Sequence, residues 1–380
     1  MLRMLHLPLC VRVSLLFCVQ TVLLAGASGQ SAPALAKAQD SFPGKSWQQV
    51  SAIERGGWSK EKLAAAHEYA NSIHSSAVMI VQGGEVVDQW GDIDKKISSY
   101  SVRKSLLSAL YGIYSAEGTI DIHQTLEQLG IDDSPDSLTK EERQARVVDL
   151  LRARSGVYHP VDFETALEKK NRPVRGSHAP GTFWYYNNWD FNVVGTIFEQ
   201  KTGLKIGEAF YQRVAKPIGM QDFQPGDVYY LGGPLSVHSA YHFEITARDL
   251  ARFGLLYLRH GRWNEKQIVP EAWVEKSSHA NEMLKVNGVE VGGYEYLWWV
   301  EYGGVHFPEV TIPGMFSARG AGPHYLLIIP SLDLVIVHRV NNDPPVKDSK
   351  TVAEIADHPV LSKAQFGHLV KLIVDARTTR

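Results

Sequence analysis

The chain has 380 residues, of which 44% are hydrophobic and 21% charged, and its formal net charge is −2 at pH 7. This is the composition of an ordinary globular protein, and it excludes a disordered, collagen-like or coiled-coil chain. The near-neutral charge offers no basic stripe for nucleic acid, so we expect no nucleic-acid partner.

The first residues have the layout of an export signal. Arg3 and Arg12 flank a short positive region, an apolar run covers residues 13–24, and small residues follow. This pattern predicts a signal peptide at residues 1–27, with cleavage after Gly29 and an uncleaved anchor as alternatives. Both cysteines lie within it, so the mature chain would have no thiol nucleophile, disulfide or Cys-ligated zinc. We therefore predict an exported protein, periplasmic or secreted, with no membrane span after cleavage.

Residues 28–45 are predicted to be a linker, and residues 46–380 a single domain. Hydrophobic periodicity and turn residues predict the following elements. In chain order they are a helix over 60–73 with Ser59 as its N-cap, a hairpin over 77–81 and 86–90, helices over 103–116, 140–153, 189–201, 206–214 and 247–258, a hairpin over 325–329 and 334–340, and a helix over 363–376.

Strands at both ends and helices in the middle predict an α+β fold, an α/β sandwich. One antiparallel sheet is built from both termini, from about 46–100 and 290–380, and is flanked by helices. The middle, about 101–289, forms a mostly helical inserted lobe.

A Ser-x-x-Lys pattern occurs three times, at Ser59–Lys62, Ser101–Lys104 and Ser137–Lys140. On a helix, positions i and i+3 share a face, so a lysine with a lowered pKa can take the serine proton. Ser59 and Ser137 precede charged helix starts, where the lysine is expected in water and Thr139 forms a capping box with Glu142.

Ser101 differs, because the residues from 105 to 113 are small or apolar on nearly every face. This predicts a buried helix, in which a first-turn lysine is costly without a purpose. The helix N-terminus also favours a developing oxyanion. The alternative is that Ser101 is only an N-cap and Lys104 extends to solvent.

Two further segments offer chemistry. Polar aromatics and amides gather between residues 184 and 189, either as a capping loop or as a tyrosine that relays protons beside a positioning amide. A glycine-rich stretch, residues 316–322, precedes a late strand, where glycine permits close backbone approach or marks a bulge.

Other residues are discounted. His238 and His242 are four residues apart but have no carboxylate ligand pattern nearby, so no metal is predicted. Trp298 and Trp299 either line a cleft or fill the sheet core.

Taken in order, Ser101 to Lys104, Tyr186 to Asn188 and the glycine-rich stretch resemble the motifs of the serine β-lactamase/penicillin-recognising superfamily. The resemblance is to its class C β-lactamase-related group, which also holds esterases and D-aminopeptidases. The segment from Pro180 to Gly195 is similar to the second motif in spacing as well as in residue type. Within the group, the chain is most similar to the 6-aminohexanoate-dimer hydrolase branch, from which no nylon-oligomer substrate is inferred.

The resemblance implies roles for individual residues. Ser101 would be the acylated nucleophile and Lys104 its base. Tyr186, rather than Tyr185, would assist proton transfer, with a shared or full role as the base as the alternative. The oxyanion hole would be the N–H groups of Ser101 and Ala321. Substrate contacts would come from Asn188, which orients substrate or Lys104, and from Arg319, Gly320 and Trp184.

The third motif departs from the family pattern. Ala318-Arg319-Gly320 stands where the family has Lys-Thr-Gly or His-x-Gly, which removes the cation that holds a β-lactam or peptide carboxylate. Arg319 is a candidate replacement, although neighbouring residues on a strand point to opposite faces. His324 either approaches the site or is structural.

We therefore expect an exported serine hydrolase that cleaves an amide or ester bond in a small molecule or short peptide and needs no cofactor. The alternatives are a non-catalytic binding scaffold of the same fold and a penicillin-binding carboxypeptidase or transpeptidase. The oligomeric state is not readable from the sequence.

Overall fold

A computed structural model describes residues 41–378, apart from 55, 163, 287 and 342–361. The predicted signal peptide and most of the predicted linker lie outside these residues. Within the described part of the chain, no helix combines the length and hydropathy that crossing a membrane requires.

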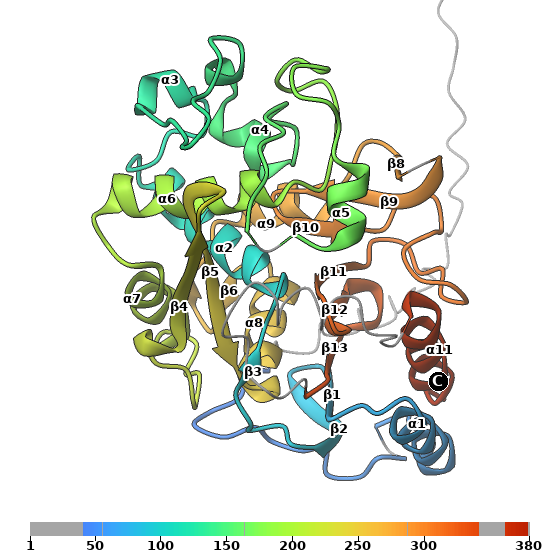
Figure 1. Cartoon of the computed structure of the whole chain (residues 1–380). Helices are drawn as coiled ribbons and strands as arrows, with labels where there is room; N and C mark the ends of the chain where they lie inside the picture. Colours follow the sequence, from blue (N-terminus) through green and yellow to red (C-terminus); the bar gives the residue numbers. More distant parts are fainter. Residues whose placement is uncertain (1–40, 55, 163, 287, 342–361, 379–380) are drawn as a thin grey trace, which may run out of the picture. The chain divides into compact units, whose positions relative to one another are not determined.

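An eight-stranded antiparallel sheet forms the centre of the fold (Figure 1), in the order β2-β1-β13-β12-β11-β10-β9-β8. The N-terminal hairpin therefore pairs directly with the last strand, which confirms the predicted sheet from both ends of the chain. The strands are β1 (Ala77–Gln82), β2 (Glu85–Gly91), β8 (Leu284–Val286), β9 (Val289–Glu295), β10 (Trp298–Val300), β11 (Phe316–Gly320), β12 (His324–Ile329) and β13 (Leu334–Arg339).

Helices cover both faces of this sheet, so its central strands are apolar on both sides. Val335 and Val337 of β13 face a core shared with α8 (Ala247–Leu258). Leu334 and Ile336 face a second core, with α1 (Lys60–Ser72) and α11 (Lys363–Asp375). The remaining helices are α2 (Val102–Ala116), α3 (Leu126–Leu129), α4 (Val147–Leu151), α5 (Ala166–Asn171), α6 (Asn188–Thr202), α7 (Ile206–Phe210) and α9 (Glu271–Ser278).

The inserted lobe contains a small sheet that the sequence pattern did not predict. Its order is β3-β5-β4, with β3 (Ile97–Ser98), β4 (Val228–Gly233) and β5 (Ser236–Ile245), and a two-stranded ribbon joins β6 (Arg262–Trp263) to β7 (Lys266–Gln267). One face of β5 carries the buried polar residues Ser236, His238 and His242, and the opposite face places Tyr241, Phe243 and Ile245 in the core. The alternation of apolar and polar residues that is typical of a strand is therefore present over residues 241–245.

The helix predicted over 140–153 is wrong. The chain turns extended at Ala145 (ψ 135°) and Arg146 (φ −96°, ψ 156°), so only α4 follows. This extended stretch forms backbone hydrogen bonds with the chain at the start of α3. The Ala145 carbonyl accepts from Leu126 N–H at 2.9 Å, and Val147 N–H donates to Gln124 O at 3.1 Å. This tertiary pairing overrides local helix propensity.

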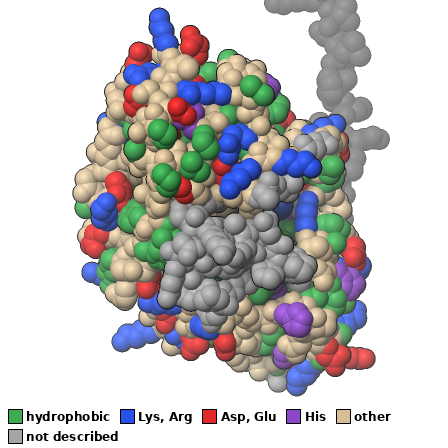
Figure 2. All heavy atoms as spheres, viewed as in Figure 1, with side chains coloured by type: hydrophobic (Ala, Val, Ile, Leu, Met, Phe, Trp, Pro, Cys, Tyr) green, Lys and Arg blue, Asp and Glu red, His purple; other side chains and the backbone are tan. Residues whose placement is uncertain are grey.

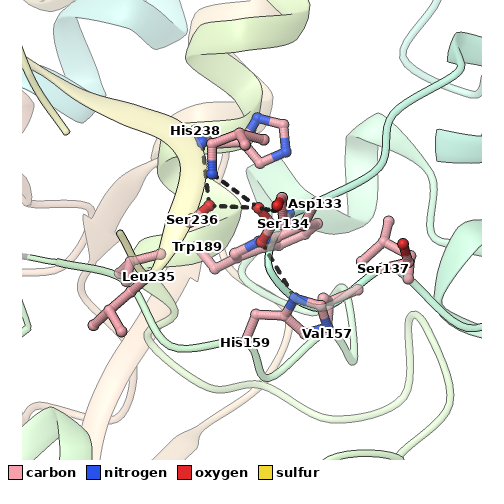
Figure 3. A network of polar contacts seen from close by, with 12 residues as sticks. Asp133, Ser134, Ser137, Val157, His159, Trp189, Leu235, Ser236 and His238 are labelled. Atoms are coloured by element: carbon pink, nitrogen blue, oxygen red, sulfur yellow. Dashed lines mark hydrogen bonds and ion pairs between the residues drawn. The ribbon is translucent and has the colours of Figure 1, made fainter. Parts of the chain in front are cut away.

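A buried carboxylate fixes one side of α6 (Figure 3). Asp133, 6% exposed, accepts hydrogen bonds from loop, helix and strand alike. Its donors are Ser134 N at 2.8 Å, His159 Nδ1 at 3.2 Å, Trp189 Nε1 at 2.6 Å, Ser236 Oγ at 2.9 Å and Val237 N at 3.0 Å. The cluster ties the loop after α3 to α6 and β5.

On the face of the molecule shown in Figure 2, Lys and Arg side chains are interspersed with Asp and Glu. The visible described surface therefore carries both signs of charge, in keeping with the net charge of −2.

Candidate active site

The chain segment that enters α2 is held from several sides. Tyr100 has a left-handed backbone (φ 46°), which is uncommon for a residue other than glycine, and its ring stacks on His324 at 5.0 Å. Arg339 donates to the carbonyls of Ile97 at 2.7 Å and Ser98 at 3.0 Å. Ser101, which comes next, is therefore presented by a firmly positioned backbone.

Ser101 occupies the N-cap position of α2, but its side chain makes no capping hydrogen bond. Instead its Oγ lies 2.6 Å from Lys104 Nζ, one helical turn further on. Lys104 is only 1% exposed, so the alternative in which it extends to solvent is wrong.

Lys104 also brings in the second motif. Its Nζ lies 2.8 Å from Tyr186 OH and 3.0 Å from Asn188 Oδ1, at the start of α6. The structure thus gathers Ser101, Lys104, Tyr186 and Asn188 around one nitrogen atom. Tyr185, the neighbouring tyrosine, points elsewhere and donates to Glu168 O at 2.9 Å.

The electrostatics of this cluster favour a neutral amine. Burial lowers the pKa of Lys104 well below its ordinary value, and the adjacent Arg103 cation lowers it further, while Glu168 opposes both. Arg103 is itself buried, with its guanidinium 4.5 Å from the Tyr241 ring, and forms no ion pair with a carboxylate among the described residues. Burial raises the pKa of Tyr186. The site therefore pairs an amine that readily loses its proton with a phenol that keeps its own.

The two other Ser-x-x-Lys patterns do not form such a cluster. Ser59 caps α1 by accepting from Lys62 N–H at 3.3 Å, and Lys62 Nζ donates to Asp375 O at 2.9 Å on the surface. Ser137 and Lys140 are both exposed. Thr139 and Glu142 form the predicted capping box.

The end of β11 lies against the segment before Ser101. A Cβ atom added to Gly320 would come within 2.6 Å of Ser99 O and 3.1 Å of Tyr100 Cβ, so this approach requires glycine. Ala321 follows directly. Among the residues that the structure describes, none accepts a hydrogen bond from the N–H of Ser101 or of Ala321. Both N–H groups are therefore available as donors.

Arg319 points to the other face of β11 from Ala318, whose side chain is buried in the α8-side core. The Arg319 guanidinium donates to Ser317 Oγ at 2.9 Å, lies 3.0 Å from His306 Nδ1, and stacks over Trp299 at 5.0 Å. His324 is fully buried and accepts from Arg339 Nε at 3.0 Å.

Aromatic rings surround Tyr186. Trp299 stacks on it at 5.6 Å, and Trp184 packs edge-on against Trp299 at 5.9 Å and is itself buried. Trp298 is fully buried against Tyr257 at 4.5 Å. The two tryptophans therefore have different places. Trp298 fills the core, and Trp299 lies beside Tyr186.

The two discounted histidines share one face of β5. His238 bonds Thr196 Oγ1 at 3.0 Å and Asp132 O at 2.9 Å, and His242 stacks on Tyr229 at 5.3 Å. No group of three potential metal ligands occurs within the described part of the chain.

One residue near the cluster was missed by the sequence interpretation. Glu168 of α5 accepts from Asn188 Nδ2 at 3.0 Å and so stands directly behind the site. The available signal was the Thr165–Glu168 capping box, which indicates a helix start but says nothing of what the carboxylate faces.

Comparisons with known proteins agree with this fold. An uncharacterized protein of Alkalihalophilus pseudofirmus is 20% identical over 293 residues, which cover 70% of this chain and 84% of that protein. A Bacillus anthracis protein described as a 6-aminohexanoate-dimer hydrolase superposes with a TM-score of 0.56 at 22% identity, covering 77% of this chain and 81% of its own. A family VIII carboxylesterase gives 0.55 at 15% identity, with coverages of 82% and 98%.

The family model for Beta-lactamase matches residues 60–358, which is more than half of the chain and includes all three motifs. That match supports a serine-hydrolase-like function. The chain belongs to the beta-lactamase family.

Proposed function

We propose that the protein is an exported serine hydrolase that cleaves an amide or ester bond in a small molecule or short peptide, through an acyl-enzyme on Ser101. The observation that carries this proposal is the 2.6 Å contact between Lys104 Nζ and Ser101 Oγ, in surroundings that lower the pKa of the lysine. A serine hydroxyl is a poor nucleophile at neutral pH, and an adjacent neutral amine supplies the base that it lacks.

In acylation, the lone pair of Lys104 takes the Ser101 proton while Oγ bonds to the substrate carbonyl carbon. The carbonyl π pair moves onto oxygen, and the N–H groups of Ser101 and Ala321 receive the oxyanion. When the tetrahedral intermediate collapses, the bond to the leaving nitrogen or oxygen breaks. The leaving group takes the proton from Lys104, directly or through the Tyr186 hydroxyl 2.8 Å away.

Deacylation repeats these steps with water as the nucleophile. Lys104 takes a proton from water, directly or through the Tyr186 hydroxyl, as the water oxygen attacks the acyl carbon, and the proton returns to Ser101 Oγ as the acid leaves. No cofactor enters either half of the reaction.

The third motif guides the choice of substrate. Ala318 is apolar and 1% exposed where the family has a cation, so we expect weak activity on β-lactams and on peptides held by a free carboxylate. Two structural neighbours bear the names of a 6-aminohexanoate-dimer hydrolase and of a family VIII carboxylesterase, and the proposal leaves amide and ester bonds both open.

Intact-mass spectrometry tests the proposal. Wild-type protein and a Ser101→Ala variant are exposed separately to a fluorophosphonate and to a penicillin, and folding of both is verified by circular dichroism. A single fluorophosphonate adduct on the wild type alone is expected, with no lasting penicilloyl adduct. A lasting penicilloyl adduct would favour the penicillin-binding alternative, and folded wild type that forms neither adduct would favour the non-catalytic scaffold.

Export is a separate part of the proposal and rests on residues 1–27 alone. Expression of the full chain followed by N-terminal sequencing of exported material should give a start at Ser28, or at Gln30 for the rival cleavage site. Protein retained in the cytoplasm with Met1 intact would contradict it.

A further inference from the structure

A carboxylate stands behind the proposed catalytic cluster and contacts none of the reacting atoms. Glu168 Oε1 accepts from Asn188 Nδ2 at 3.0 Å, and Asn188 Oδ1 lies 3.0 Å from Lys104 Nζ. Lys104 Nζ in turn lies 2.6 Å from Ser101 Oγ. A continuous hydrogen-bonded chain therefore runs from Glu168 to the serine hydroxyl.

Glu168 is held in place on both sides. Its second oxygen, Oε2, accepts from Thr165 N–H at 2.8 Å, and its own N–H donates to Thr165 Oγ1 at 3.1 Å. Its carbonyl accepts from the Tyr185 hydroxyl at 2.9 Å. Tyr185 directly precedes Tyr186. The chain segment that brings the Tyr186 hydroxyl to Lys104 therefore also holds α5, the helix that carries Glu168.

The two ends of the Asn188 amide differ in their chemistry. The oxygen only accepts hydrogen bonds and the nitrogen only donates them, whereas an ionised carboxylate only accepts. With Glu168 on one side, the Asn188 nitrogen must face the carboxylate and the oxygen must face Lys104. A flipped amide would turn two donors toward the lysine and set an oxygen against the carboxylate.

We propose that Glu168 is a positioning residue, which selects the orientation of the Asn188 amide and thereby holds the Lys104 amine beside Ser101. The proposal deepens the function proposed above and rests on it. It also gives α5 a role in the chemistry, although no residue of α5 touches the serine.

The charge of Glu168 acts on the pKa of Lys104. The pH dependence of labelling therefore distinguishes the proposed role from a purely structural one, which would leave it unchanged. The ionisable groups that act on Lys104 come from four elements, namely Arg103 on α2, Glu168 on α5, Tyr186 before α6 and His242 on β5. Glu168 is the anion of the set. Removing its charge should shift the pH at which Lys104 loses its proton downward.

The test measures fluorophosphonate labelling of Ser101 in wild type, Glu168→Gln and Thr165→Ala, with kinact and KI determined as a function of pH. Glu168→Gln should lower the plateau kinact about tenfold while KI changes less than twofold, because a neutral amide replaces the charged acceptor and can present either its oxygen or its nitrogen to Asn188. Its acid limb should move to lower pH. Thr165→Ala keeps both contacts of the Glu168 carboxylate, so it should lower the Tm by a few degrees and leave kinact unchanged.

A double-mutant cycle shows whether Glu168 acts through Asn188. In an Asn188→Ala background, Glu168→Gln should change kinact less than twofold. Should Glu168→Gln fail to fold, Glu168→Asp replaces it, and kinact should fall with the acid limb unmoved, because the charge remains.

Three outcomes would overturn the inference: a wild-type kinact in folded Glu168→Gln, an equal loss in Thr165→Ala, or the full loss again in the Asn188→Ala background. Failure of wild type to label at all would overturn the proposed function instead.

Discussion

Two buried polar clusters, one around Lys104 and one around Asp133, meet at the N-terminus of α6, where two consecutive residues each contact one of them. Asn188 reaches Lys104, and Trp189 reaches Asp133 through its indole nitrogen at 2.6 Å. Around Asp133, burial alone would raise the pKa, but hydrogen bonds from His159, Trp189 and backbone groups outweigh it and hold the pKa below its ordinary value. Around Lys104, burial and a second cation prevail and its pKa falls.

The difference lies in how each charge is treated. Five hydrogen-bond donors stabilise the charged form of Asp133. Such a carboxylate is suited to holding separate helices, strands and loops together. The Lys104 cluster destabilises its charged form, which favours a neutral amine beside the Ser101 hydroxyl. In this molecule the perturbed pKa of Lys104 coincides with a neighbouring serine hydroxyl, whereas the perturbed pKa of Asp133 coincides with contacts that join separate elements.

The largest expected effect comes from removing the base. Lys104→Ala should reduce the rate of fluorophosphonate labelling of Ser101 by about a thousandfold, within the range usual for a general base. The measurement is the second-order labelling rate, with circular dichroism as a check on folding. A rate within threefold of wild type would remove Lys104 from the mechanism.

Breaking the other cluster should affect stability rather than chemistry. Asp133→Asn leaves several buried donors poorly paired and should lower the free energy of unfolding by about 3 kcal/mol. Urea denaturation monitors this loss, and labelling of Ser101 well below the Tm should stay within threefold of wild type. Loss of labelling in protein that is still folded would show that the two clusters are coupled through α6.

A smaller effect is expected from the pH dependence of stability. His159 lies between Asp133 at 3.2 Å and Glu142 at 3.6 Å. Burial lowers its pKa, but the two carboxylates outweigh burial and raise it above its ordinary value of 6.5. A raised pKa means that this stabilisation is complete below about pH 6.5 and is lost as the pH rises through the folded-state value.

Urea midpoints measured from pH 5.5 to 9 should therefore decline more steeply for wild type than for His159→Gln. Parallel profiles for the two proteins would mean that His159 is neutral in the folded state throughout this range.

The smallest effect is expected at the duplicate pattern. Lys62→Ala removes an exposed lysine whose Nζ, within the described part of the chain, donates a hydrogen bond only to the Asp375 carbonyl. Stability should therefore change by less than about 0.5 kcal/mol and labelling by less than twofold. It is the matched control for Lys104→Ala, because both changes remove the lysine of a Ser-x-x-Lys pattern.

The sequence predicted the parts of the molecule where local pattern and burial agree. The helix at Ala247–Leu258 matches its predicted bounds. The apolar residues after Ser101 predicted a buried helix, and Lys104 is buried there whereas Lys62 and Lys140 are exposed. β5 was missed because its alternation of apolar and polar residues covers only residues 241–245 and ends just before the helix at Ala247. The 140–153 helix failed because Arg146 pairs with Thr125 in an extended segment. Glu168 lies in a charged surface-like helix, and only the fold brings it to Asn188.

The pairing of β1 with β13 determines when the central sheet can form during synthesis of the chain. The partner of residues 77–82 is residues 334–339, so the central sheet closes only when nearly the whole chain has left the ribosome. Contacts so distant in sequence slow folding. A growing chain that lacks β13 cannot close its sheet, and one edge of β1 stays without its strand partner until the last strand is made.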